Sequence, residues 1–75
     1  MIGEKIRKAR EEKRYTQEYM AAQLGLNQST YCRIESGLIP ASVQQIIVIS
    51  KLLDLSLDYL AEYDGNQNNN PSDES

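Results

Sequence analysis

The side chains best suited to specific hydrogen bonding lie between Leu26 and Gly37, in the segment Leu-Asn-Gln-Ser-Thr-Tyr-Cys-Arg-Ile-Glu-Ser-Gly. Asn27 is a favourable helix N-cap, because its side-chain oxygen can accept hydrogen bonds from the free N–H groups of a first turn. Gly37 is the residue type that ends a helix in a left-handed conformation. The segment therefore predicts a short helix over about residues 28–36.

At helical spacing, this segment divides into an apolar face and a polar face. Tyr31 and Ile34 fall on the apolar side. The opposite side carries Gln28, Ser29, Cys32 and Arg33. A short helix fits the width of the DNA major groove, and Gln, Ser and Arg can hydrogen-bond the edges of bases there. The polar face thus indicates a surface that reads DNA.

A second short helix is predicted directly before this one. Thr16 is its N-cap, residues 17–24 form it, and Gly25 ends it. The chain restarts after only Leu26 and Asn27. Two helices joined by a tight turn that contains glycine are typical of the helix-turn-helix unit.

Three further helices should brace this unit. Apolar residues at helical spacing predict a helix over about residues 2–13, and Ser42 with Gln45 forms a capping box for a helix through Leu53. A last helix is expected over about residues 57–62. The predicted core consists of Ile2, Ile6, Ala9, Met20, Ala21, Leu24, Leu26, Tyr31, Ile34, Val43, Ile46, Ile49, Leu53, Leu55, Leu57 and Leu60.

Length and composition limit the class of protein. With 75 residues there is room for one domain, which we assign to residues 1–63. Residues 64–75 contain no apolar residue and are expected to be a disordered acidic and polar tail. The longest apolar run, residues 46–49, is too short to cross a membrane, and no secretory signal opens the chain. We therefore expect a cytoplasmic protein.

Chemistry at an active site or a metal is not expected. The chain has one cysteine and no histidine, so neither an internal disulfide nor a Cys/His metal cluster can form. It also lacks a phosphate-loop pattern and a convincing pair of carboxylates. We expect no enzymatic activity, no cofactor and no small-molecule effector.

The charge is unevenly distributed along the chain. The formal net charge is −3, but residues 1–37 hold seven basic and five acidic side chains, and residues 54–75 hold six acidic and no basic ones. This separation leaves one face free to meet phosphate. The net negative value predicts weak non-specific attraction to DNA, because that attraction scales with the number of phosphates neutralised.

Residues 2–60 resemble the Cro/cI, or XRE-type, helix-turn-helix family of phage and bacterial regulators. The resemblance implies an all-α, compact five-helix bundle of the lambda-repressor-like DNA-binding type, acting as a dimer on DNA. The segments that carry it are Ile-Gly-Glu-Lys-Ile-Arg-Lys-Ala-Arg at 2–10, Tyr-Thr-Gln-Glu-Tyr-Met-Ala at 15–21, Leu-Gly-Leu at 24–26, Arg-Ile-Glu-Ser-Gly at 33–37 and Leu-Ser-Leu-Asp-Tyr-Leu at 55–60.

The resemblance also implies roles for individual residues toward DNA. Gln17 matches a residue that meets a phosphate or supports a base-reading side chain; the alternative is a solvated first-turn residue. Arg33 could read guanine or hold a phosphate, and Asn27 would add a phosphate contact to its capping role. The expected DNA-binding residues are Gln17, Asn27, Gln28, Ser29, Thr30 and Arg33.

Two other positions match a structural feature of the family. There, an arginine in the first helix pairs with a glutamate late in the third, which here gives Arg10 and Glu35. This pair would fix the recognition helix to the scaffold and would not contact DNA. Lys13 and Arg14 could approach the DNA backbone or simply cap a solvated helix end.

The chain departs from the family at two places. Leu38 and Ile39 stand where basic residues often clamp phosphate, and Pro40 comes one residue early. Cys32 lies on the recognition face, but nothing near it in the sequence gives a reason for a lowered thiol pKa. We interpret Cys32 as a small contact residue and not as a redox sensor.

The helix over residues 43–53 carries more apolar surface than one face needs. Its extra residues, with two tyrosines further on, form a candidate dimer surface: Ile47, Val48, Leu52, Tyr59 and Tyr63. Two copies would hold their recognition helices about 34 Å apart, one turn of DNA.

Two functions remain open at this stage. The first is a small transcriptional regulator, expected to be a repressor, that binds a palindromic DNA operator as a homodimer. The alternative is a protein-interaction module, such as an antitoxin-like partner, that uses the exposed apolar surface of the last two helices.

Overall fold

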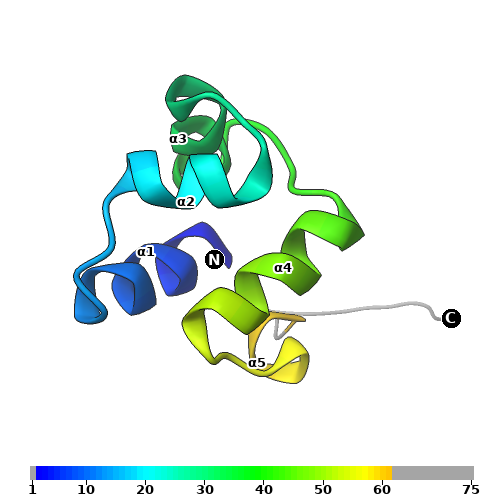
Figure 1. The fold of residues 1–75 in the computed structure, drawn as a ribbon. Coiled ribbons are helices and arrows are strands. Elements are labelled where there is room, and N and C mark those ends of the chain that lie inside the picture. The colour runs from blue at the N-terminus through cyan, green and yellow to red at the C-terminus, as the bar shows by residue number, and fades with distance from the viewer. Residues whose placement is uncertain (1, 62–75) are drawn as a thin grey trace, which may run out of the picture.

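The computed structural model describes residues 2–61, which form five helices. They are α1 (Ile2–Glu12), α2 (Gln17–Leu24), α3 (Gln28–Ser36), α4 (Val43–Leu53) and α5 (Leu57–Ala61). Figure 1 shows α2 and α3 together at one end, with α1, α4 and α5 beneath them. The all-helical fold predicted from the sequence is confirmed over these residues. The tail expected over residues 64–75 and the Tyr63 position lie outside the described residues.

The helix starts are fixed by the capping side chains that the sequence contains. Thr16 and Asn27 each accept a hydrogen bond from a first-turn N–H, at 2.9 Å in both cases. Ser42 and Gln45 form a reciprocal capping box, and Ser56 accepts from Tyr59 N at 3.0 Å. These local bonds satisfy N–H groups that a helix terminus otherwise leaves without partners.

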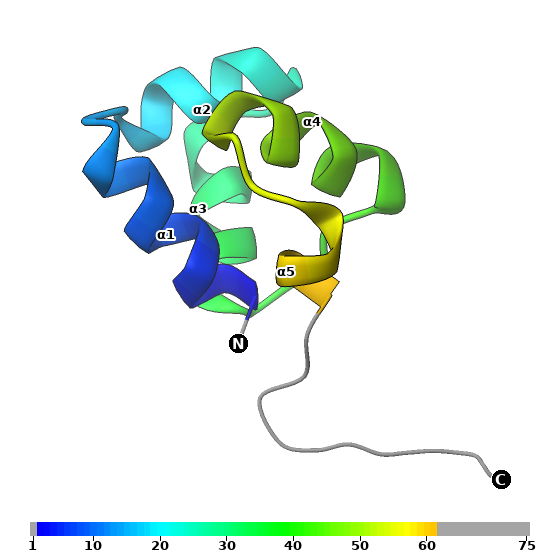
Figure 2. The same ribbon diagram turned by 90° about the horizontal axis from the view of Figure 1, so that it is seen from below.

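Each helix contributes to a single core. Its largest fully buried side chains come one from each helix: Ile6, Met20, Tyr31, Ile49 and Leu60. Two helices each contact three others: α1 contacts α3, α4 and α5, and α4 contacts α1, α2 and α5. Figure 2, seen from below, shows α1 and α5 on the near side of the bundle with α3 behind α1. The α2–α3 unit is therefore held from behind by α1 and α4.

Two residues predicted for the core are exposed instead. Val43 is 78% exposed and Leu57 is 47% exposed. Each is the first residue of its helix, so its side chain lies beyond the turns that pack against neighbouring helices. The apolar spacing correctly identified the other core residues of α4 and α5. It does not define how far along each helix the contact with neighbouring helices extends.

The first helix ends one residue earlier than predicted. It stops at Glu12, although Lys13 N still donates to Ala9 O at 3.1 Å. Arg14 then adopts a left-handed conformation with φ of 62°, which turns the chain toward α2. L residues rarely adopt this left-handed conformation, and Arg14 adopts it where the chain leaves α1.

Gly3 allows α1 and α3 to approach each other closely. A Cβ atom added at Gly3 would overlap the backbone carbonyl of Glu35, near the C-terminal end of α3. Only glycine avoids that overlap, because it has no side chain. The position of α3 on the bundle therefore depends on a backbone contact as well as on side-chain packing.

Candidate nucleic-acid interface

The second and third helices are joined by a tight left-handed turn. Gly25 has φ of 70°, and its N–H donates to Ala22 O at 3.2 Å. Leu26 N then donates to Ala21 O at 2.9 Å, which satisfies a second carbonyl at the end of α2. This arrangement gives partners to two of the last carbonyls of α2, those of Ala21 and Ala22, and sets the angle at which α3 begins.

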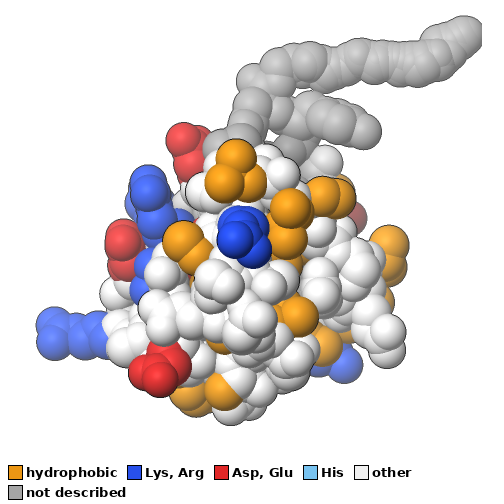
Figure 3. All heavy atoms as spheres, turned by 90° about the horizontal axis from the view of Figure 1, so that it is seen from above, with side chains coloured by type: hydrophobic (Ala, Val, Ile, Leu, Met, Phe, Trp, Pro, Cys, Tyr) orange, Lys and Arg blue, Asp and Glu red, His pale blue; other side chains and the backbone are white. Residues whose placement is uncertain are grey.

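The polar face of α3 points away from the bundle. Tyr31, Ile34 and Glu35 are buried, whereas the side that was predicted to read DNA is open to solvent. Figure 3 views the molecule from the side on which α2 and α3 lie in Figure 1, and most of that surface is white, the colour of the backbone and of side chains that are neither charged nor hydrophobic. The exposed residues of α3 include Gln28, Ser29, Cys32 and Arg33, and Thr30 is half-buried.

The first turn of α3 is organised by one oxygen atom. Asn27 Oδ1 accepts from Thr30 N and from Ser29 Oγ, both at 2.9 Å. The cap therefore also holds the Ser29 hydroxyl in place, which leaves the serine oxygen available to accept from a partner. Within residues 2–61, the side chains of Gln28 and Arg33 make no hydrogen bond or ion pair with each other or with a neighbour.

Behind this exposed face, Glu35 connects three helices. Its Oε2 accepts from Arg10 Nε at 2.7 Å and from the Tyr31 hydroxyl at 2.5 Å. Its Oε1 accepts from Gln17 Nε2 at 3.2 Å and from Arg10 Nη2 at 3.4 Å. Arg10 also donates through Nη1 to Tyr15 O at 2.8 Å. Together these bonds tie α3 to α1 and to the start of α2.

The network fixes the protonation of Arg10 and Tyr31. Burial alone lowers the pKa of the Arg10 guanidinium, but the hydrogen bond and the charge of Glu35 outweigh burial and raise it. Burial raises the pKa of the Tyr31 phenol, and the hydrogen bond to Glu35 raises it further. Arg10 is therefore a cation and Tyr31 a neutral donor under ordinary conditions.

One basic residue beside the interface did not stand out in the sequence. Arg7 is exposed on α1 and lines a hollow of about 150 Å³ with Gln17, Cys32, Glu35 and Ser36. Arg7 lies three residues before Arg10, so both fall on the side of α1 that faces α3. That spacing is the signal that would have identified it.

Of the two basic residues at the end of α1, one is engaged elsewhere. Lys13 Nζ lies 3.1 Å from Asp54 Oδ2, at the C-cap of α4. The pair is largely exposed, so it contributes little to stability. Arg14 is exposed at the start of the α1–α2 turn.

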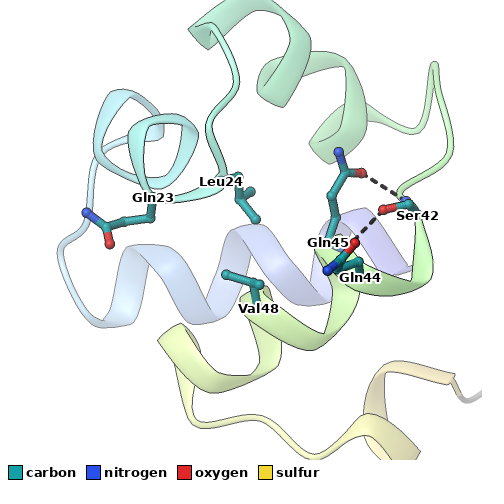
Figure 4. Close-up of a pocket in the computed structure, with 6 residues that line it drawn as sticks. All are labelled: Gln23, Leu24, Ser42, Gln44, Gln45 and Val48. Atoms are coloured by element: carbon teal, nitrogen blue, oxygen red, sulfur yellow. Dashed lines mark hydrogen bonds between the residues drawn. The ribbon is translucent and has the colours of Figure 1, made fainter.

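A second hollow lies on the other side of α2, against α4. It measures about 340 Å³ and is drawn in Figure 4. The bonds between Ser42 and Gln45 that Figure 4 marks are those of the capping box. Among the residues that the structure describes, no ionisable side chain lines it, so they place no acid or base there. Its lining residues are Gln23, Leu24, Ser42, Gln44, Gln45 and Val48.

The candidate dimer surface is only partly open. Ile47, Val48 and Leu52 are half-buried, and Leu52 packs against the core. Tyr59 is exposed, and Lys5 Nζ lies 4.6 Å from the centre of its ring. Lys5 also donates to Tyr59 O at 2.8 Å, so α1 already holds this part of α5.

The described residues contain neither a metal-binding cluster nor a membrane span. Between residues 2 and 61, no group of three or more Cys, Asp or Glu side chains could hold a metal ion. None of the five helices in this range is long and apolar enough to cross a bilayer.

Comparison with known proteins gives a family and two relatives. The family model described as Helix-turn-helix matches residues 6–60. The chain is 37% identical over 67 residues to a Bacillus subtilis (strain 168) protein named "Uncharacterized HTH-type transcriptional regulator YqaE". The aligned region covers 89% of this chain and 58% of that protein. It is 33% identical over 60 residues to "SPbeta prophage-derived uncharacterized HTH-type transcriptional regulator YonR" from the same organism. Here the aligned region covers 80% of this chain and 56% of that protein.

The match to these relatives is partial in length. The chain spans a little over half of each of the two curated proteins. No solved structure matches the chain significantly.

Proposed function

Because the chain belongs to the helix-turn-helix family, of the XRE type, we propose that it binds double-stranded DNA sequence-specifically and regulates transcription. The observation that carries this proposal is the division of α3 into two faces. Its back is buried and fixed to α1 and α2 through Glu35, while Gln28, Ser29 and Arg33 are exposed on its front. A rigid helix with a free polar face is suited to insertion into a major groove.

The proposed roles divide between base edges and phosphates. Gln28 can pair with adenine, Ser29 with several base edges, and Arg33 with guanine or with a phosphate. Gln17 lies at the start of α2, where a helix N-terminus favours an anion. Asn27 and Thr30 would position the first turn of α3 against the backbone of the duplex.

The exposed Arg7 adds a cation to this set. It shares a hollow with Gln17 and Cys32, so it lies beside the start of α2 and the exposed side of α3. A guanidinium at that place can meet a phosphate bidentately. Arg7 therefore partly replaces the basic residues that are absent after Gly37, where Leu38 is exposed instead.

We further propose that two copies bind a palindromic operator as a homodimer and repress transcription. The half-buried Ile47 and Val48 on α4 and the exposed Tyr59 on α5 supply the apolar surface for the contact. A dimer whose recognition helices stand about 34 Å apart would meet successive major grooves. Sedimentation equilibrium with and without the operator duplex tests this assembly.

Selection from a random duplex library tests the proposed function. Purified protein should enrich one sequence, and that duplex should bind about a thousandfold more tightly than a scrambled one. Fluorescence anisotropy at several salt concentrations gives both affinities, and binding should weaken as salt rises. A chain that enriches no sequence and shows no salt-sensitive binding does not have this function.

One observation favours the alternative, a protein-interaction module. Leu38 is 75% exposed and Val43 is 78% exposed, so each leaves a large apolar side chain open to contact with a second protein. Binding of a second protein at Leu38 or Val43, by a chain that does not bind DNA, would support the alternative. The same selection experiment therefore separates the two functions.

A further inference from the structure

Two side chains of different character meet on the Glu35 carboxylate. The hydroxyl of Tyr31 donates to Oε2 at 2.5 Å, and the carboxamide of Gln17 donates to Oε1 at 3.2 Å. Tyr31 is fully buried, whereas Gln17 is half-buried at the start of α2. Glu35 therefore connects a hydroxyl in the core to an amide at the edge of the proposed interface.

The bond to Glu35 decides which way the Gln17 amide faces. A glutamine amide has a donor end and an acceptor end, and it can turn over unless a partner fixes it. An ionised carboxylate only accepts, so Glu35 selects the donor end. With one Nε2 proton directed to Glu35, the second proton and Oε1 remain available to another partner.

The Tyr31 hydroxyl helps to hold the carboxylate itself. Oε2 accepts from Tyr31 and from Arg10 Nε, and these two bonds are the shortest of the four at Glu35. The weaker bonds, from Gln17 and from Arg10 Nη2, share Oε1. Loss of the hydroxyl would free one position on Oε2, and the carboxylate could then turn relative to Gln17.

We propose that Tyr31 is a positioning residue for DNA binding: through Glu35, its hydroxyl holds the Gln17 carboxamide in one orientation toward the duplex. This inference rests on the proposed DNA-binding function. Tyr31 itself does not touch DNA, because it is enclosed by the core. Its contribution to affinity therefore passes through Gln17.

A double-mutant cycle tests the proposal. Tyr31→Phe keeps the buried ring and removes only the hydroxyl. It should weaken binding to the selected duplex by about three- to tenfold, the size of coupling found within one hydrogen-bond network. In a Gln17→Ala background, the same change should leave the dissociation constant within about twofold, since the amide it positions is absent.

Tyr15→Phe is the matched control. It also removes a phenol hydroxyl, but within the described residues the Tyr15 side chain makes no bond to Glu35. It should leave affinity unchanged. The fraction of folded protein is measured by circular dichroism for each variant, and the dissociation constants are corrected for it.

A second measurement does not depend on DNA or on any variant. The Nε2 group of Gln17 in the free protein should have an NMR order parameter of about 0.8, close to that of rigid backbone. A value below about 0.6, typical of a flexible group, would overturn the proposal even if Tyr31→Phe did not fold.

The outcomes separate this inference from the proposed function. If the wild-type chain binds its selected duplex and Tyr31→Phe binds equally well, only the positioning role fails. An equal loss in the wild-type and Gln17→Ala backgrounds would also overturn it, because Tyr31 would then act independently of Gln17. If the wild-type chain binds no duplex, the proposed function fails and the inference fails with it.

Discussion

Arg10 in α1 and Glu35 in α3 form a buried ion pair with 2.7 Å between Nε and Oε2. Their side chains are 11% and 3% exposed, so neither charge can be fully solvated. The pair crosses from the scaffold to the back of the proposed recognition helix. It therefore links the stability of the bundle to the placement of Gln28, Ser29 and Arg33.

Loss of one partner of this pair should be costly. Arg10→Met leaves the Glu35 carboxylate buried without its cation, and we expect the free energy of unfolding to fall by about 3–5 kcal/mol. Lys13→Met is the control, because the Lys13–Asp54 pair is largely exposed and should contribute less than about 1 kcal/mol. Urea unfolding measures both values. Equal losses for the two variants would contradict the role assigned to burial.

The stability contributed by Tyr31 should depend on pH in the alkaline range. Because burial raises the pKa of its phenol above the ordinary value of 10.0, folding favours the protonated form. That stabilisation is complete below about pH 10 and falls by about 1.4 kcal/mol per pH unit above it.

Urea unfolding of the wild type and of Tyr31→Phe between about pH 8 and 12 tests this dependence, since other groups titrate equally in both proteins. The stability of the wild type relative to the variant should decrease above about pH 10. A constant difference over the whole range would show that the phenol is not held protonated.

Gly3 should not tolerate a side chain. Gly3→Ala places a Cβ atom against the Glu35 carbonyl, so α1 and α3 must separate, and we expect a loss of about 1–3 kcal/mol or more. Lys8→Ala, on the exposed side of the same helix, controls for helix propensity and should stay within about 0.5 kcal/mol. Thermal unfolding compares them. A neutral Gly3→Ala variant would mean that the close approach does not occur.

Arg33 should contribute to sequence preference. Arg33→Ala is expected to weaken binding to the selected duplex more than binding to a scrambled one. The difference should be about 1–3 kcal/mol if the guanidinium reads guanine. Lys51→Ala removes an equal charge from the exposed side of α4 and should affect both duplexes little. Anisotropy titrations against both duplexes measure the difference. An equal loss on both would reassign Arg33 to a phosphate.

The helices were predictable because their boundaries are encoded locally. Thr16, Asn27 and Ser42 each bond to an N–H three residues ahead, so the sequence alone identifies them as caps. The two-faced character of α3 follows from spacing in the same way. Val43 and Leu57 were assigned wrongly, because apolar spacing defines a face but not how far the neighbouring helix covers it.

The network behind α3 was only partly predictable. The family resemblance implied that Arg10 and Glu35 pair, but Tyr31 looked like an ordinary apolar residue of the core. The hydrogen bond from its hydroxyl to Glu35, and the bond from the Gln17 amide to the same carboxylate, depend on how α1, α2 and α3 cross. No local sequence pattern encodes that crossing. The close approach at Gly3 depends on the same crossing.

Chemical-shift mapping tests the central claim most directly. Backbone and side-chain amide signals of the labelled chain are followed as the selected duplex is added. We predict the largest changes at Gln17 and at residues 28–33, with small changes on α4 away from α3. Changes concentrated on α4 and α5, or no changes with any duplex, would contradict the claim that the open face of α3 binds DNA.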